Sequence, residues 1–225
     1  MKIVIVGASG TVGRAVVAEL DKNGQHELIR VGHRQGDLCV DLTDEASVDA
    51  LFSQTGKVDA IIATTGNVFF GPLGEMTAED FTLGLQDKLL GQVRLALKGQ
   101  HFLNDGGSIT LTSGIIADVP IAQGVNATTV NAALAGFVKA AACELPRGIR
   151  INLVSPTLLT ESEADYGPFF PGFESVPATR VALGRWHFVG AWKACKAGRC
   201  LKSGIDGPEC PVAQAGRAYD DMFLL

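Results

Sequence analysis

Several features that would quickly assign a chain to a class are missing from this sequence. No apolar run approaches the length needed to cross a bilayer. The run that follows Met1 ends at Gly7, too early for the hydrophobic region of a secretory signal. The net charge of −5 supplies no positive field for nucleic acid or an anionic membrane. We therefore expect no nucleic-acid partner and no membrane, and small-molecule chemistry becomes the first hypothesis.

Cysteine is also too sparse for a disulfide scaffold. The five cysteines are an odd number and form no C-x-x-C pair, which suits a reducing cytosol and predicts a cytoplasmic protein. A zinc site is conceivable near the carboxyl end, but its spacings lack a paired knuckle, so we predict no metal. The residues considered for it are His187, Cys195, Cys200 and Cys210.

Short β-branched runs alternate with helix-length amphipathic stretches. The chain has 225 residues, 47% of them hydrophobic, enough for one well-buried domain. Alternation of this kind predicts an α/β fold with a doubly wound parallel sheet of Rossmann type. The predicted strands are 2–6, 27–31, 38–40, 58–63, 108–112 and 150–154. The predicted helices are 12–23, 46–54, 78–99 and 127–145, with caps at Thr43 and at Thr77 with Asp80.

A glycine-rich turn, GASGTVG at residues 7–13, follows the first strand and opens a helix. Such a turn lets bare backbone approach a pyrophosphate, which then sits on the N–H groups and the positive end of the helix. The pattern alone is weak, since an ordinary strand-to-helix turn can look the same. Its place at the first strand–helix junction favours dinucleotide binding. The expected contacts are Gly7, Ser9, Gly10, Thr11, Val12 and Gly13.

The end of the second strand predicts which dinucleotide binds. An NAD site would place a carboxylate there for the ribose hydroxyl, but the sequence has His33 and Arg34. The planar guanidinium of Arg34 suits a 2′-phosphate, so we predict NADP, with NAD the less favoured alternative. Asp41 and Leu42 come where the adenine amine would be read, although Asp41 is equally an ordinary residue before a helix.

Three further motifs fall at predicted strand ends, in the order Thr64-Thr65-Gly66-Asn67, Thr112-Ser113-Gly114 and Ser155-Pro156-Thr157. With the glycine turn and Asp41, they resemble the short-chain dehydrogenase/reductase family over roughly residues 1–183. Ligands of open α/β sheets bind at these carboxyl ends. The resemblance implies cofactor contacts from Thr65, Gly66, Asn67, Pro156 and Thr160.

The catalytic residues of that family are only partly present. Its chemistry uses a tyrosine as acid/base, a lysine one turn later and a serine that holds the substrate carbonyl. Ser113 matches the serine, but Ala127 and Asn131 occupy the other two positions. An alanine offers no proton, and an amide carries no charge to lower a neighbouring pKa. Lys88 stands at the position of the asparagine that the family often uses in a proton relay.

Two accounts of this departure stay open. In the first, the chain is an NADP(H)-dependent oxidoreductase of a small carbonyl or alcohol substrate. Lys88 then supplies the missing charge or the proton, and Tyr166, one of two tyrosines, is the other candidate acid. In the second, the fold binds the dinucleotide as a catalytically weak sensor or regulatory protein. Each of the three residues also has a purely structural interpretation. Ser113 can cap backbone groups, Lys88 can be a solvated lysine on a helix, and Tyr166 can pack the loop against the core. We favour the oxidoreductase.

The last part of the chain has a different character. Residues 155–177 form a Gly/Pro/Phe-rich stretch typical of a lid or binding loop. Beyond Leu183 no periodic pattern continues, so we divide the chain into a dinucleotide-binding domain, 1–183, and a poorly packed tail, 184–225, that lacks the last strand usual in the family. An out-of-frame origin of the tail is one hypothesis. The sixth strand would then be an exposed edge. A homo-oligomer stays open.

Overall fold

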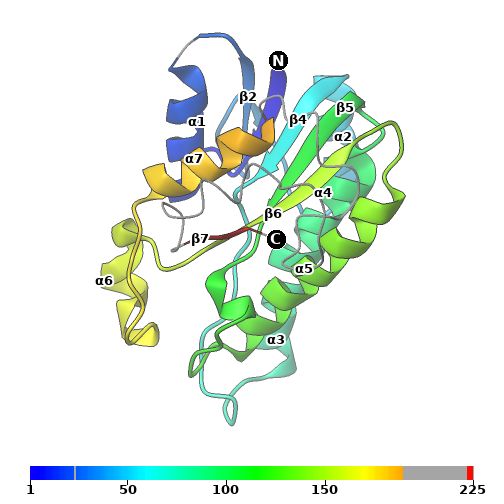
Figure 1. Ribbon diagram of the computed structural model, residues 1–225. Helices are drawn as coiled ribbons and strands as arrows, with labels where there is room; N and C mark the ends of the chain where they lie inside the picture. Colours follow the sequence, from blue (N-terminus) through cyan, green and yellow to red (C-terminus); the bar gives the residue numbers. More distant parts are fainter. Residues whose placement is uncertain (23, 190–221, 225) are drawn as a thin grey trace, which may run out of the picture.

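A single parallel sheet organises the molecule. The computed structural model describes residues 1–22, 24–189 and 222–224. The strand order is β3-β2-β1-β4-β5-β6-β7, and β1 to β6 are parallel. The chain winds outward from β1 to β3, crosses back, and winds outward again from β4, which confirms the doubly wound Rossmann prediction (Figure 1). The parallel strands are β1 (Lys2–Val6), β2 (Glu27–Gly32), β3 (Leu38–Cys39), β4 (Val58–Ala63), β5 (Leu103–Thr112) and β6 (Arg150–Pro156).

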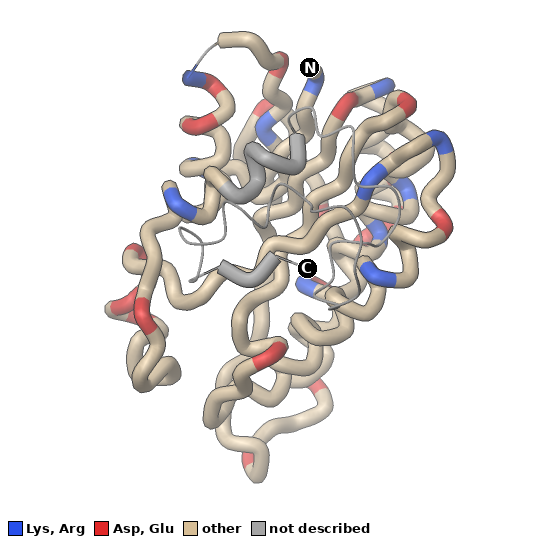
Figure 2. Tube along the Cα trace, in the orientation of Figure 1, with Lys and Arg blue, Asp and Glu red and all other residues tan. Residues whose placement is uncertain are grey.

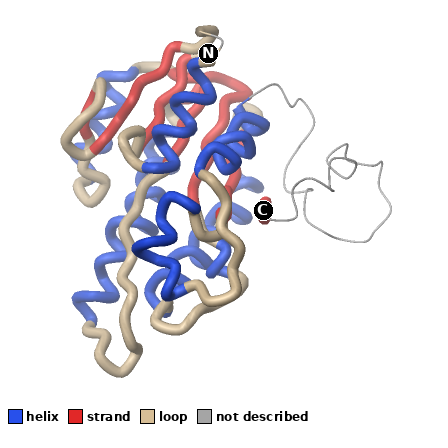
Figure 3. The backbone as a smooth tube through the Cα atoms, turned by 90° about the vertical axis from the view of Figure 1, so that its left-hand side faces the viewer, coloured by secondary structure: helices blue, strands red, loops and turns tan. Residues whose placement is uncertain are grey.

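Helices cover both faces of the sheet, as Figures 1 and 3 show. One face carries α1 (Thr11–Asp21) and α7 (Ala178–Val189), which pack on each other. The other face carries α2 (Glu45–Thr55), α4 (Gly91–Gly99) and α5 (Val125–Glu144). Because β1 to β6 are parallel, their carboxyl ends lie at the same end of the sheet. The segments that connect strands to helices surround this end.

Alternation along β1 divides the core between these two layers. Ile3 and Ile5 pack in the cluster that includes Val16 of α1, and Val4 packs in the cluster that includes Phe52 of α2. All three strand residues are 0% exposed. A strand buried on both faces reads as a continuous apolar run, which is why the sequence predicted β1 accurately.

The predicted helix 78–99 is wrong as a single α-helix. It consists of α3 (Ala78–Gly84), a π-helical turn η1 (Leu85–Leu90) and α4. The N–H of Gly91 donates to the carbonyl of Gln86, a five-residue spacing that inserts one extra residue into the turn. The apolar pattern continues through η1, so periodicity does not reveal the insertion.

Of the two predicted helix caps, one is confirmed. Thr77 and Asp80 form the reciprocal capping box at the start of α3. The cap at Thr43 is wrong: Asp44 caps α2 by accepting from the N–H of Ala46. Thr43 turns back instead, and its hydroxyl donates to Asp41 at 2.7 Å.

The segment after β6 is less irregular than predicted. It contains η3 (Thr160–Ser162), α6 (Glu163–Tyr166) and η4 (Gly167–Phe169). The two ends of this segment are tied together, because Leu159 bridges to Val176 and both carboxylate oxygens of Glu161 accept from the N–H of Ala178 at 3.0 Å. The segment after β5 contains one 3-10 turn, η2 (Ile115–Ala117). Local polar contacts of this kind leave no hydrophobic period in the sequence.

The sequence analysis predicted that the sheet would lack a last strand beyond β6. The edge is not bare, however. β7 (Met222–Leu224) pairs antiparallel with Val154–Pro156, so the expectation of an exposed β6 is wrong along these residues. Three residues are too few for alternation to predict a strand.

The predicted domain boundary at Leu183 falls inside α7. Residues 190–221 and the side chains considered for zinc lie outside the described residues, so the division of the chain and the tail hypotheses stay predictions. Among the helices that are described, none combines the length and apolar character needed to span a membrane.

Candidate active site

The glycine turn forms a cradle between β1 and α1. Gly7 adopts φ +81°, and its N–H donates to the carbonyl of Val31 at 2.8 Å. A Cβ on Gly13 would lie 2.0 Å from the carbonyl oxygen of Gly7, so the helix approaches the turn as closely as bare backbone allows. No side chain caps the start of α1 at Gly10. Uncapped N–H groups at a helix start suit an anion such as pyrophosphate.

The end of β2 lies beside this cradle. A Cβ on Gly32 would be 3.6 Å from the hydroxyl oxygen of Ser9, which places the following residues, His33 and Arg34, next to the turn. Both side chains are exposed. Arg34 forms no ion pair with any residue in the described part of the chain. Its guanidinium is therefore available to an external anion.

Asp41 is held at the adjoining strand end by Thr43. Hydrogen bonds from the hydroxyl and N–H of Thr43, at 2.7 and 2.8 Å, lower the pKa of the Asp41 carboxyl, and the nearby charges of His33 and Arg94 act in the same direction. Arg94 also donates to the carbonyl of Leu42 at 3.0 Å. These contacts order residues 41–43 without using every acceptor of Asp41.

Residues 64–67, after β4, connect the cradle to the π-helical turn. The Thr64 hydroxyl lies 3.0 Å from the carbonyls of Val6 and Gly7. Thr65 follows it, half-buried. Gly66 adopts φ +123°, and a Cβ there would lie 2.6 Å from Cγ of Lys88. The missing side chain of Gly66 is what admits Lys88 to this position. The neighbouring Asn67 donates its amide to Asp87.

A buried glutamine, which the sequence analysis missed, joins Lys88 to the strand that carries Ser113. Gln92 is 0% exposed. Its amide donates to the carbonyl of Thr112 at 2.8 Å and lies 3.3 Å from the carbonyl of Lys88, while its oxygen accepts from the N–H of Thr112 at 2.8 Å. The turn that bears Lys88 is thus fixed against the residue that precedes Ser113. A polar residue four positions after Lys88 on a buried helix face was the available signal.

Ser113 lies at the end of β5 and is 3% exposed. Its hydroxyl donates to the backbone carbonyl of Asn131 at 3.0 Å. This contact matches the purely structural interpretation, in which the hydroxyl caps a backbone group. Ala127 is 0% exposed, so neither a proton donor nor space for one exists at its side chain. The site can bind a carbonyl through Ser113 only if this hydroxyl turns away from Asn131.

The carboxamide of Asn131 is the unusual group of the site. The residue is 3% exposed, and its oxygen is buried without a hydrogen-bond partner within the described structure. A Cβ on Gly114 would lie 3.3 Å from its nitrogen, which places the carboxamide at the end of β5. An unpaired buried acceptor costs about 1–3 kcal/mol. A ligand with a hydrogen-bond donor would remove that cost.

Asn126, the residue before Ala127, has a structural role that the sequence analysis also missed. It is 0% exposed, accepts from the N–H of Phe69 at 2.9 Å and donates to the carbonyl of Phe81 at 2.7 Å. It ties α5 to the loop after β4 and to α3. Its partners are backbone atoms distant in sequence, so the sequence could not assign them.

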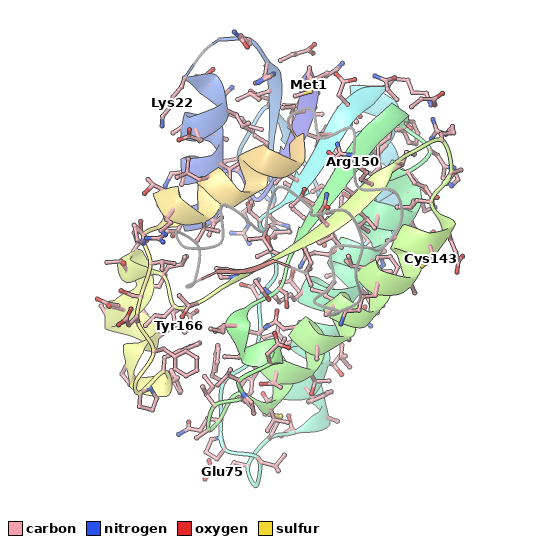
Figure 4. The ribbon with its side chains drawn as sticks, viewed as in Figure 1. Met1, Lys22, Glu75, Cys143, Arg150 and Tyr166 are labelled. Atoms are coloured by element: carbon pink, nitrogen blue, oxygen red, sulfur yellow. The ribbon has the colours of Figure 1, made fainter. Side chains whose placement is uncertain are left out.

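Among the hydrogen bonds of the described residues, none joins Tyr166 to Ser113. Tyr166 is 43% exposed on α6, and its ring packs on Phe70 with centroids 5.6 Å apart. Figure 4 labels it beside α6, away from the strands. The remaining predicted contacts sit at the end of β6: Pro156 is within the strand, and the Thr160 hydroxyl is 3.1 Å from that of Ser175. Tyr166 is therefore placed at the rim of the site.

Comparisons with known proteins agree with this fold. The family model described as enoyl-(acyl carrier protein) reductase matches residues 2–189. L-xylulose reductase of Mesocricetus auratus is 25% identical, with 84% of each chain covered. The crystal structure of the protein lin1944 from Listeria innocua is 47% identical with a TM-score of 0.81, covering 84% of this chain and 93% of that one. A small-chain dehydrogenase solved in complex with NADPH is 24% identical with a TM-score of 0.78, covering 88% and 94%.

Proposed function

This chain belongs to the short-chain dehydrogenase/reductase family, and from that membership we propose that it reduces a small carbonyl compound with NADPH, or oxidises the corresponding alcohol with NADP. The observation that carries the proposal is the position of Lys88. It lies over Gly66 in a π-helical turn, and Gln92 ties that turn to the residue before Ser113. The backbone of the turn that bears this cation is thereby tied to the strand that carries Ser113, the one hydroxyl of the family pattern that this chain keeps.

The residues around the first strand fit NADP. The pyrophosphate would lie on the uncapped start of α1, where Gly10 leaves room for it and Gly13 lets the helix approach the turn closely. Arg34 would pair with the 2′-phosphate, and the unpaired oxygen of Asn131 would accept from a donor at the nicotinamide end. One structural neighbour was solved with NADPH, which is consistent with this assignment. The bound cofactor supplies or accepts a hydride.

The chain's own residues then have separate roles. Ser113 turns its hydroxyl from Asn131 to the substrate carbonyl oxygen. Lys88 stabilises the negative charge that develops on this oxygen and donates the proton that completes the alcohol. Tyr166, at the rim, is the alternative proton donor. Ala127 contributes no group to the reaction.

Anaerobic mixing of the purified protein with NADPH and a panel of small aldehydes and ketones tests this function. We expect loss of NADPH absorbance that depends on the carbonyl compound. If NADPH binds but no carbonyl compound or alcohol is turned over with either cofactor, the protein is a dinucleotide-binding sensor and the reductase proposal is wrong.

The cofactor preference has its own test in Arg34→Ala. This change should weaken NADPH binding but not NADH binding, because only NADPH has the 2′-phosphate. The expected loss is about 1.5–3 kcal/mol, the size of one charge-assisted contact. Calorimetric titration of both cofactors measures it. Arg30→Ala is the matched control, since Arg30 already lies near Asp21 and Asp37 and should not read the phosphate. Equal affinities of the parent protein for the two cofactors would contradict the assignment.

A further inference from the structure

The three segments that surround the carboxyl ends of β4, β5 and β6 carry negative charges only. Residues 64–87, 113–138 and 151–179 contain no lysine, arginine or histidine. Figure 2 shows the result, with acidic and no basic residues on the segments below the sheet. The acids are Glu75, Glu79, Asp80, Asp87, Asp118, Glu161, Glu163, Asp165 and Glu174. The first basic residue beyond these segments on the β4 side is Lys88.

Aromatic rings bridge two of these segments. Phe70, in the loop after β4, contacts Tyr166, Phe169 and Phe170, with ring centroids 5.6, 5.2 and 6.5 Å apart. Phe170 in turn meets Phe173 edge-on at 5.5 Å. We call these five residues the aromatic bridge. Tyr166 is 43% exposed, so part of this aromatic surface faces solvent.

Topology places the aromatic bridge beside the reacting centre. β5 lies between β4 and β6 in the sheet, so contacts between the segments that follow β4 and β6 pass in front of the end of β5. That end carries Ser113. A substrate whose carbonyl oxygen reaches Ser113 can therefore extend toward the aromatic bridge.

We propose that the substrate is an organic cation, an aldehyde or ketone that carries an amine or quaternary ammonium group at the end remote from its carbonyl. Aromatic faces attract ammonium groups. The acids of the three segments, which we call the rim, concentrate ligands of positive charge. Anionic substrates, including acyl thioesters of coenzyme A, would be repelled by the acids of these three segments.

This inference rests on the proposed reductase function and adds the class of substrate. The reaction itself is unchanged: a hydride forms the new C–H bond at the carbonyl carbon, and the C=O double bond becomes a single bond. Lys88 delivers the proton to oxygen, and the ammonium group takes no part. The carbonyl end faces Lys88 and the cationic end faces the aromatic bridge, so the two positive charges lie at opposite ends of the substrate.

Matched aryl methyl ketones provide the first test. The para substituents are trimethylammoniomethyl, its neutral isostere neopentyl, and carboxymethyl, each separated from the ring by a methylene so that carbonyl reactivity stays similar. We expect kcat/KM for the cation to exceed that for the neutral ketone by about tenfold, in the range of a desolvated cation–π contact. The preference should shrink as the salt concentration rises from roughly 0.05 to 0.5 M. No preference, or preference for the anion, would overturn the inference.

A charge-neutralising pair of substitutions tests the origin of the preference. Glu163→Gln with Asp165→Asn removes two exposed acids that flank Tyr166 in α6. It should reduce the preference for the cationic ketone while leaving kcat/KM of the neutral ketone unchanged. Asp21→Asn with Glu144→Gln is the matched control, with the same change in net charge at the opposite ends of the strands. If both pairs act equally, net charge rather than the rim is responsible and the inference is wrong.

An equilibrium measurement separates this inference from the proposed function. Calorimetric titration of benzyltrimethylammonium into protein saturated with NADP should show binding that the Glu163/Asp165 pair weakens and the control pair does not. Binding of the cation without turnover of any ketone would refute the reductase proposal and support the cation site. Turnover of neutral ketones without binding of the cation would refute the cation site alone.

Discussion

Lys88→Met is expected to lower kcat/KM for carbonyl reduction by about 10²- to 10⁴-fold, the usual contribution of a positioned acid, while NADPH affinity stays close to that of the parent protein. Methionine keeps the length and helix propensity of lysine but has neither charge nor proton. The side chain would still pack over Gly66, which admits it through the absence of a Cβ. Steady-state kinetics and a parallel NADPH titration measure the two effects separately.

Two further variants identify what Lys88 supplies. Lys88→Arg keeps the positive charge but cannot release a proton at accessible pH. It should retain activity if Lys88 acts only through its field, and lose activity if Lys88 is the acid. Lys98→Met is the control, because Lys98 pairs with Glu45 and Asp49 on the outer side of α4. Intact turnover in Lys88→Met together with loss in Tyr166→Phe would show that Tyr166 is the acid and that our assignment is wrong.

Gly10→Val is expected to abolish binding of NADPH and NADH in a protein that still folds. The backbone of Gly10 is ordinary for any residue, at φ −73° and ψ 171°. A Cβ there would lie 3.3 Å from the carbonyl oxygen of Gly7, a contact that a small shift can relieve. The side chain would instead occupy the approach of the pyrophosphate to the start of α1. Calorimetry measures binding, and circular dichroism with thermal unfolding measures the fold.

Other glycines provide the comparison for this variant. Gly13→Ala should lower Tm markedly, since its Cβ would lie 2.0 Å from the carbonyl oxygen of Gly7. Gly74→Val should change neither fold nor binding, because nothing lies within 4 Å of its Cβ position. If Gly10→Val still binds the dinucleotide with parental affinity, the nucleotide site lies elsewhere in the molecule.

The sequence was sufficient to predict the order of the strands and the glycine-rich turn that we propose as the nucleotide site. Buried parallel strands are continuous apolar runs, so β1 and β4 were predicted with their observed bounds. Glycine positions follow from sterics, which is why residues 7–13 could be assigned to a cradle. The π-helical turn and β7 were missed because one inserted residue and a three-residue strand leave no period to read.

The proposed catalytic arrangement was harder to predict from sequence because it depends on contacts between distant residues. Ser113 and Lys88 could be named from a family pattern, but Gln92, which joins the backbone of Lys88 to that of Thr112, could not. The same holds for the unpaired oxygen of Asn131 and for the contact between Phe70 and Tyr166. Each depends on the three-dimensional path of a loop or helix, which local propensity does not contain.

The paired hydrogen bonds of Gln92 also have a consequence for the order in which the site assembles. The N–H of Thr112 donates to the Gln92 side chain rather than to a neighbouring strand, so the sheet alone does not shield it. Its exchange with deuterium is therefore limited by undocking of α4 from β5, whereas amides inside β5 wait for the strands themselves to separate. Transient release of α4 would separate the turn that bears Lys88 from the strand that bears Ser113 while leaving the glycine cradle intact, so cofactor capture can precede completion of the proposed catalytic centre.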